Sequence, residues 1–401
     1  MNTDTKQYIY LDHAATTPVD PRVLEAMLPF LREQYGNPSS IHGPGRVVKA
    51  AIEQAREEVA RLINALPAEI VFTSGGTESD NEAVRLAMQI AGDGRTDILT
   101  SPAEHHAVLS ACKHAEQTGA VVRYLPVDGA AVPDIDQIDA LIGPQTAFCS
   151  LMHVNNETGG VLPLAETART LARHDVLFHC DAVQSAGKLP LDVRDIPVSL
   201  LSLSAHKIHG PKGVGALYVR NGLRIGQLQF GGGQERGRRG GTENVASIIG
   251  FGAAARIARE EMDERHGRWH LLRAIAVGLL NDALPELHYN GGGDASLPNI
   301  LSITLPSSRY DIDGGALLMN CDVAGLAISS GSACAAGSIE PSHVIRAIGR
   351  DDAETAATVR ISFGAFTNEE EVRNGIGIFI RVVQEMSARS SPRSHSRMTM
   401  P

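Results

Sequence analysis

Short apolar runs alternate with amphipathic stretches along the first two thirds of the chain. Each run is short enough for one buried strand, and the residues between the runs repeat at helical spacing, most clearly from Val47 to Leu62. The runs lie at 69–73, 97–100, 121–125, 146–154, 176–181, 198–203 and 213–220. This alternation predicts an α/β fold with a large, mostly parallel, doubly wound sheet flanked by helices.

The pattern changes after a segment at 231–242 that holds six glycines and three arginines. A long helical stretch from 243 to about 280 follows, and then a smaller α/β unit with strands at 300–305, 324–329 and 358–363 and helices at 312–320 and 368–387. We therefore expect a large domain over 15–262, a small domain made of 1–14 and 263–388, and a disordered tail over 389–401.

Composition narrows the class of protein. With 401 residues and 43% hydrophobic content the chain can bury more than one core. A net charge of −10 argues against nucleic-acid binding, and no apolar run approaches the ~20 residues of a membrane span. The first residues lack a signal-peptide pattern, and the five cysteines show no CxxC or metal spacing. These features predict a cytoplasmic protein with free thiols.

Lys207 is the first candidate for chemistry. It follows the apolar run 198–203, and Gly210-Pro211 behind it forbids a helix. A long amine at a strand end suits covalent chemistry on a carbonyl, provided that burial or a cationic neighbour lowers its pKa. His206 or a bound cofactor could supply that positive charge. The alternative is an ordinary surface lysine in a loop.

Asp181 ends another apolar run, 26 positions before Lys207, which leaves room for one more strand between them. A carboxylate that faces lysine-bound pyridoxal 5′-phosphate keeps the pyridine nitrogen protonated and lets the ring accept carbanion charge. Asp181 could instead be a helix cap or a salt-bridge partner. His105 and Asn156 also fall at the carboxyl ends of predicted strands, where a doubly wound sheet places its site.

The turn Ser74-Gly75-Gly76-Thr77-Glu78 joins the strand at 69–73 to a helix expected from about Asp80. A strand, a glycine turn and a helix in this order point backbone N–H groups at an anion, and they favour a phosphate. The turn is neither a Walker loop nor a GxGxxG fingerprint. The alternative is a simple glycine turn with Thr77 as the helix N-cap.

Cys334 and Arg360 are the remaining candidates. Cys334 lies among small residues at 330–338, where a thiol is exposed and can be reactive, although an incidental loop cysteine is the alternative. Arg360 lies in the middle of a strand and needs a carboxylate, either from the protein or from a substrate. The other cysteines lie in predicted strands or helices and are expected in the core; they are Cys112, Cys149, Cys180 and Cys321.

Six motifs along the chain together resemble one enzyme family. They are Phe72–Ser79, His153–Gly159, Asp181–Gln184, Ser204–Lys207, Gly240–Asn244 and Ser329–Cys334. The family is that of the cysteine desulfurases, pyridoxal phosphate enzymes of the class V aminotransferase group, and the resemblance covers 10 to about 387. The loop at 334–343 is similar to that of the long-loop subgroup, the NifS and IscS kind.

The resemblance implies that the chain converts L-cysteine to L-alanine and forms a persulfide on Cys334 for a sulfur acceptor or an iron–sulfur scaffold protein. It implies that Lys207, Cys334 and His105 are catalytic: Lys207 holds the cofactor as a Schiff base and moves the Cα proton, while His105 stacks on the ring and assists proton transfer. It further implies that the cofactor ring is contacted by Asp181, Gln184 and Asn156, and the cofactor phosphate by Gly76, Thr77, Ser204 and His206. The protein would be a homodimer, in which the partner subunit's Thr242 also binds this phosphate. The substrate would be bound by Arg360 and Asn156.

Three other functions are open to a chain with these residues. A selenocysteine or cysteine lyase would release its product directly, against which the long loop of Cys334 argues. A non-catalytic assembly subunit would not need Lys207, Asp181, His105 and Arg360 together. A zinc site at His105, His106, His206 and His209 lacks the HExxH or Cys/His spacing of known sites.

Overall fold

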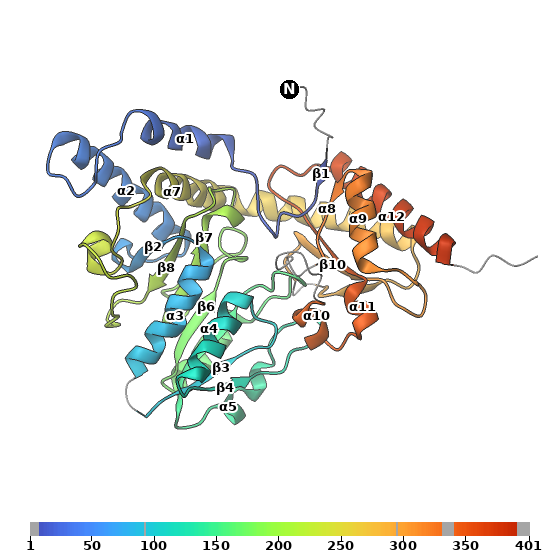
Figure 1. Cartoon of the computed structure of the whole chain (residues 1–401), viewed down its shortest axis with the longest axis horizontal. Coiled ribbons are helices and arrows are strands. Elements are labelled where there is room, and N and C mark those ends of the chain that lie inside the picture. Colours follow the sequence, from blue (N-terminus) through green and yellow to red (C-terminus); the bar gives the residue numbers. More distant parts are fainter. Residues whose placement is uncertain (1–7, 92–93, 294–295, 331–340, 391–401) are drawn as a thin grey trace, which may run out of the picture.

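The computed structural model describes residues 8–91, 94–293, 296–330 and 341–390. Figure 1 shows a larger body, coloured blue to green, and a smaller body, coloured orange to red, with the long helix α8 running between them. The predicted α/β class with a mostly parallel sheet is confirmed. Cys334 lies outside the described residues.

The larger body is built on a seven-stranded sheet with the order β2-β8-β7-β6-β5-β3-β4. Its strands are β2 (Ile70–Thr73), β3 (Asp97–Thr100), β4 (Val121–Tyr124), β5 (Thr146–Met152), β6 (Leu177–Asp181), β7 (Leu200–Ser204) and β8 (Gly215–Val219). Only β8 runs antiparallel to its neighbours, β2 and β7. Because β6 and β7 are adjacent and parallel, with Asp181 opposite Ser202, their carboxyl ends share one edge of the sheet.

Helices cover both faces of this sheet. One face carries α1 (Pro21–Arg32), α2 (Gly43–Leu62), α6 (Leu164–Arg173) and α7 (Val245–Glu260), and the other carries α3 (Gly76–Ala91) and α4 (His106–Gln117); α5 (Ile138–Leu141) is a single turn. Leu201 and Leu203 pack in the cluster with α2 and α7, whereas Leu200 packs in the cluster with α3 and α4. The sheet is therefore the middle of three layers, as a doubly wound fold requires.

The face under α3 turns polar toward the carboxyl edge. Successive side chains of a strand point to opposite faces, so His179 and Asp181 in β6 lie under α3 while Phe178 and Cys180 pack on the other side. The same alternation in β7 places Ser202 under α3. One face thus supplies apolar packing and the other supplies chemically active groups.

The smaller body has its own sheet and core. Strands β9 (His288–Asn290), β10 (Ile300–Thr304) and β12 (Thr358–Ser362) form an antiparallel sheet in the order β12-β10-β9, and β1 (Ile9–Tyr10) pairs with β11 (Leu326–Ala327) in parallel. The helices are α8 (Met262–Ala283), α9 (Gly314–Ala324), α10 (His343–Ala347), α11 (Asp352–Ala356) and α12 (Glu369–Ser390). Helix α12 reaches Ser390, so 389 and 390, which were expected in the tail, belong to this helix. Every helix within the described ranges is too short or too polar to cross a bilayer.

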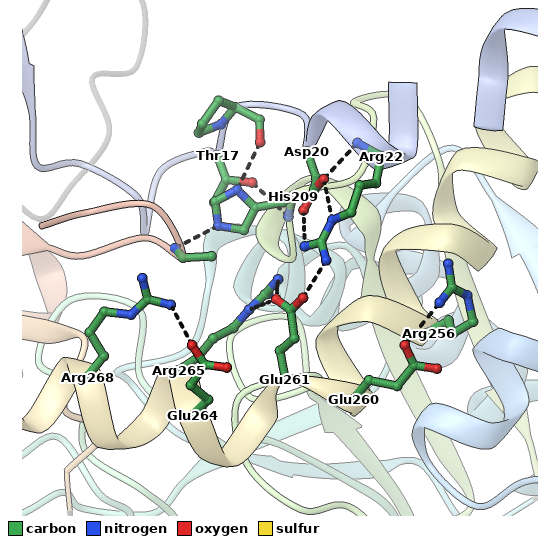
Figure 2. Close-up of polar contacts among 12 residues, drawn as sticks. Thr17, Asp20, Arg22, His209, Arg256, Glu260, Glu261, Glu264, Arg265 and Arg268 are labelled. Atoms are coloured by element: carbon green, nitrogen blue, oxygen red, sulfur yellow. Dashed lines mark hydrogen bonds and ion pairs between the residues drawn. The ribbon is translucent and has the colours of Figure 1, made fainter. Parts of the chain in front are cut away.

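The long helix expected over 243–280 is two helices that meet at Glu261. Arg22 and Arg265 both bind the Glu261 carboxylate, at 2.5 and 2.8 Å, and Arg22 also binds Asp20, the N-cap of α1 (Figure 2). These ion pairs hold Glu261, the residue between α7 and α8, in place. The domain boundary near Met262 stays a prediction, which the separate apolar clusters before and after it support.

The segment at 231–242 is fixed to the larger body by a buried ion pair. Arg56 of α2 binds both carboxylate oxygens of Glu235, at 2.7 and 2.8 Å, and Glu235 also accepts the Phe72 N–H at 3.0 Å. Glu235 and Arg236 both have left-handed backbone, with φ of 47° and 58°. A strained turn of this kind needs strong local contacts, which the Arg56–Glu235 pair provides.

We predict that Glu235→Gln lowers the free energy of unfolding by about 3 kcal/mol or more, because it leaves the buried Arg56 guanidinium with only the exposed Glu53 as a charge partner. Glu260→Gln is the matched control, since the Arg256–Glu260 pair is exposed and should change stability by less than about 0.5 kcal/mol. Urea unfolding followed by circular dichroism measures both. Equal losses in the two variants would contradict the assignment.

Candidate active site

A cavity of about 280 Å³ lies at the carboxyl edge of the large sheet. It gathers most of the residues that the sequence analysis selected; these are Gly76, Thr77, His105, Asn156, Asp181, Gln184, Ser204, His206, Lys207 and Arg360. Thr242 is exposed and lies outside this lining. Cys334 is the other selected residue that cannot be placed here, since it lies outside the described residues.

Lys207 lies in a single 3-10 turn directly after β7. Its Nζ donates to the backbone carbonyls of Ala14 and Ala15, both at 2.7 Å. Burial and the nearby Arg360 guanidinium lower the pKa of Lys207 to about 8. A sizeable fraction of free amine therefore exists near neutral pH, which a nucleophile for carbonyl chemistry requires.

His206 does not supply the positive charge that the sequence analysis considered for it. Burial, followed by the charges of Lys207, Lys212 and Lys188, lowers the pKa of His206 to about 4, so its ring is neutral. That interpretation was wrong, because a buried imidazole beside lysines gives up its proton first.

Thr17 and His209, which Figure 2 shows next to each other, bind the backbone around the turn that carries Lys207. Thr17 donates from its backbone N–H and its hydroxyl to the His206 carbonyl, at 3.1 and 2.9 Å. His209 donates from Nδ1 to the Pro18 carbonyl and accepts the Ala365 N–H at Nε2, both at 3.0 Å. His209 therefore ties the lysine turn to the smaller body.

Asp181 ends β6 and begins a turn, in which its carboxylate accepts the Val183 N–H at 2.9 Å. Since no helix follows directly, the helix-cap alternative is wrong. Burial raises the pKa of Asp181 to about 6, against the effects of the Val183 N–H and of Lys207. The carboxyl and the lysine amine thus face one cavity and influence each other's charge.

The phosphate cradle predicted at the glycine turn fits an anion. Helix α3 begins at Gly76, earlier than expected, so Thr77 lies inside the first turn and is not its N-cap. The first N–H groups of a helix have no intrahelical acceptor, and they point out of its end. A Cβ at Gly76 would lie 2.8 Å from Val183 Cγ2, and Ser204 Oγ is buried without a partner among the described residues. A second hollow of about 350 Å³ adjoins this end of the helix.

His105 is held in one tautomer. Its Nδ1 accepts the Ala107 N–H at 3.1 Å and caps α4, which leaves the proton on Nε2. Burial, followed by the charges of Lys207, His106 and His343, lowers the pKa of His105 to about 4. A neutral ring therefore borders the cavity.

Arg360 has a carboxylate partner in the protein, which was one of its two alternatives. Its NH2 group binds Asp12 Oδ1 at 2.9 Å, and its NH1 group donates to the Asn156 carbonyl at 2.7 Å. The guanidinium is buried yet still lines the cavity. Asp12 was missed, although it follows a short apolar run, as Asp181 does.

Gln184 is also bound at both ends of its amide. Its Nε2 donates to the Ala14 carbonyl at 2.8 Å, and its Oε1 accepts from Lys188 Nζ at 2.9 Å. Burial lowers the pKa of Lys188 to about 7. Gln184 therefore presents a fixed side chain to the cavity.

Four further polar residues line or border the site and were not selected from the sequence: Asp80, Glu104, Glu157 and His343. Ser342 donates to Glu157 at 2.5 Å, and His343 donates to the Glu104 carbonyl at 2.8 Å. The His343 ring lies 4.4 Å from that of His106, which had been weighed only as a zinc ligand. Among the described residues no group of three potential ligands could hold a metal ion.

The chain is similar to known proteins along most of its length. The family model of the class-V aminotransferases matches residues 9–374. The chain belongs to the class-V aminotransferase family. Within this family it is 42% identical over 382 residues to the cysteine desulfurase IscS of Dictyoglomus turgidum, covering 95% of this chain and 96% of that protein.

Two solved structures have a similar fold over most of the chain. A NifS-like protein matches with a TM-score of 0.88 and 37% identity, covering 94% of this chain and 100% of its own. A structure described as SspA in complex with cysteine matches with a TM-score of 0.78 and 36% identity, covering 90% of this chain and 99% of its own.

We predict that Lys207 of the cofactor-free protein titrates near pH 8, because burial and Arg360 disfavour its charged form. Reductive methylation with isotopically labelled formaldehyde, followed by NMR titration of the methyl signals, measures this pKa. Lys113, an exposed lysine of α4, is the reference signal. A Lys207 signal that titrates together with that of Lys113 would contradict the prediction.

Proposed function

We propose that this chain is a cysteine desulfurase, which converts L-cysteine to L-alanine with pyridoxal 5′-phosphate and takes the sulfur as a persulfide on Cys334. The observation that carries the proposal is a buried lysine amine with a pKa near 8, opposite Asp181 and beside an anion cradle at the start of α3. Relatives at 42% identity carry the same name, and one similar structure is described as a complex with cysteine.

Each group of the cofactor has a complement among the cavity residues. When bound, pyridoxal phosphate supplies an electron sink for the negative charge left at the substrate Cα. Lys207 would bind its aldehyde carbon, Asp181 would pair with its pyridine nitrogen, and His105 would cover its ring. The phosphate would be held by Gly76, Thr77, Ser204 and His206, and the ring oxygen would be contacted by Gln184 and Asn156.

The same residues can orient the substrate and move its proton. Arg360 would bind the L-cysteine carboxylate from within the cavity, with its orientation fixed by Asp12 and the Asn156 carbonyl. The Lys207 amine, once displaced by the substrate amine, would take the Cα proton. Its pKa of about 8 suits a base that works near neutral pH.

The sulfur step requires the thiol of Cys334 to enter the cavity. The residues that flank 331–340 are bound next to the cavity. Before this segment, Ser329 exchanges backbone hydrogen bonds with Arg360, and after it the Ser342 hydroxyl donates to Glu157. The Cys334 thiolate would attack the substrate sulfur, forming an S–S bond as the substrate C–S bond breaks. The electron pair of the broken bond stays on carbon, which takes a proton and becomes the methyl group of alanine.

We also propose a homodimer, in which the partner subunit's Thr242 completes the phosphate site. Large apolar side chains stand exposed at the end of α1, on the α1–α2 connection and on the segment that leads to Thr242; they are Leu31, Tyr35, Ile41 and Phe230, with exposed fractions of 61%, 87%, 91% and 85%. Exposed apolar groups of this size favour a protein contact.

The sulfur would leave the enzyme for an acceptor protein, such as an iron–sulfur scaffold. We propose that this takes place in the cytoplasm. The cysteines that the structure describes are all free thiols, which fits a reducing compartment.

We predict that Cys334→Ala lowers the rate of alanine formation by about 100-fold or more, because the variant lacks the nucleophile that accepts the sulfur. Cys112→Ala, which changes a buried thiol of α4, is the control and should keep most of the rate. Alanine is measured by chromatography, and the persulfide by mass spectrometry of the Cys334 peptide. Full-rate sulfur transfer by Cys334→Ala would refute the relay.

We predict that Thr242→Ala weakens cofactor binding about tenfold, because a hydrogen bond to a charged group is lost. Mixed dimers locate that bond. Pairing a Lys207→Ala subunit with a Thr242→Ala subunit should restore one site of parental affinity, because the intact Lys207 then meets the intact threonine of the other chain. Cofactor titration by visible absorbance measures this, and mixed dimers without any site of parental affinity would contradict a threonine supplied in trans.

A further inference from the structure

Three carboxyl groups are buried together in and around the active-site cavity. Asp80 of α3, Glu104 after β3 and Asp181 of β6 are 1%, 0% and 6% exposed, and Asp80 and Asp181 both line the cavity. Carboxylates in one buried space repel each other, and burial disfavours the charge of each. The three groups therefore cannot all be ionised.

The local contacts decide which group keeps its charge. Asp181 accepts the Val183 N–H and is attracted by Lys207. Glu104 accepts a single N–H, from Met152, at 2.8 Å. Asp80 Oδ1 has no hydrogen-bond donor among the described residues. The negative charge is best supported on Asp181.

The groups that face Asp80 from the neighbouring strands offer it no cation. His179 Nε2 lies 3.7 Å from Asp80 Oδ1, but it is bound to Ser202 Oγ at 2.9 Å, and burial lowers the pKa of His179 to about 3. Burial and the charges of Asp181 and Glu104 raise the pKa of Asp80 well above its ordinary value, against a hydrogen bond from Ser202.

The cations of the site are directed elsewhere. Lys207 donates to backbone carbonyls and acts on Asp181, Arg360 binds Asp12, and Lys188 binds Gln184. His105, the other titratable group of the wall near Asp80, is neutral. A proton on Asp80 is the remaining way to satisfy this side chain.

We propose that Asp80 is a positioning residue that stays a neutral carboxylic acid in the folded protein and so leaves Asp181 as the ionised group opposite the cofactor nitrogen. The proposal rests on the cofactor site proposed above. A negative charge on Asp80 would repel that on Asp181 and would favour protonation of Asp181. The carboxyl pair would then hold the pyridine nitrogen less firmly.

The sign of the pH effect follows from this assignment. A carboxyl that is protonated in the folded protein loses its proton on unfolding at any pH above about 4. The folded state is therefore penalised more and more as pH rises from that value toward the raised pKa. Asparagine at position 80 has a similar shape and no proton to lose, so it removes this part of the pH dependence.

The test compares thermal unfolding of the cofactor-loaded parent and Asp80→Asn between about pH 5 and pH 8.5. We expect the unfolding temperature of the variant minus that of the parent to increase by about 3 °C from the lower to the upper end of this pH range. Asp97→Asn, which removes a buried carboxylate paired with Arg123 at 3.1 Å, is the matched control and should show no such gain. An Asp80→Asn curve that runs parallel to the parent, or loses ground as pH rises, overturns the proposal.

The affinity for the cofactor distinguishes the proposed role of Asp80 from a purely structural one. We expect the dissociation constant of pyridoxal phosphate to rise at least about tenfold more in Asp181→Asn than in Asp80→Asn, because only Asp181 carries the charge. Equal losses in the two variants overturn the proposal. A parent that binds no pyridoxal phosphate would instead refute the cofactor site, while the pH dependence of its unfolding would still decide the state of Asp80.

A measurement on the parent alone covers the case in which Asp80→Asn fails to fold. A buried carboxylic acid keeps its C=O stretching band in the infrared spectrum at about pH 8, where exposed carboxyl groups have lost theirs. We expect this band in the folded parent from Asp80, with a contribution from Glu104, a buried carboxyl group that also has no cation partner among the described residues. Its absence overturns the proposal.

Discussion

The active site depends on the burial of one amine. Lys207 sits at the end of a central strand, where water is scarce and the Arg360 guanidinium is near, so its positive charge is disfavoured. The backbone carbonyls of Ala14 and Ala15 hold the amine in place. These carbonyls come from the N-terminal segment, which crosses from the smaller body to the larger one, and so both bodies are needed to set the chemistry of this lysine.

The period of two residues in the central strands organises the rest. In β6 and β7, apolar side chains alternate with polar ones, so that the α2 and α7 side forms the core and the α3 side holds Asp181 and Ser202. The same residues therefore support both the fold and the site. Helix α3 joins the two, because its first turn lines the cavity where we propose that phosphate binds, while Asp80, one turn further on, lies among the buried polar groups.

The sequence was sufficient for the features that depend on local pattern. Strand ends, the glycine turn and the adjacency of Asp181 and Lys207 follow from apolar runs and their spacing, whereas Gln184 and Ser204 were selected through the family resemblance. The sequence was insufficient where partners lie far apart in the chain. The Asp12–Arg360 pair joins positions 348 residues apart, and the neutral state of His206 depends on burial and on lysines brought near by folding. Asp80 looked like an ordinary helix residue, because the burial of its side chain between α3 and the sheet has no local signature.

The contact between Glu235 and Phe72 has a consequence for the outer strand of the large sheet. β2 ends the strand order, and an outermost strand ordinarily offers its free N–H groups to any extended segment that meets it. Here a carboxylate fixed by Arg56 occupies the Phe72 N–H. The Glu235 side chain thus occupies the place where the strand of another chain would pair with β2, and it protects this edge strand against edge-to-edge aggregation.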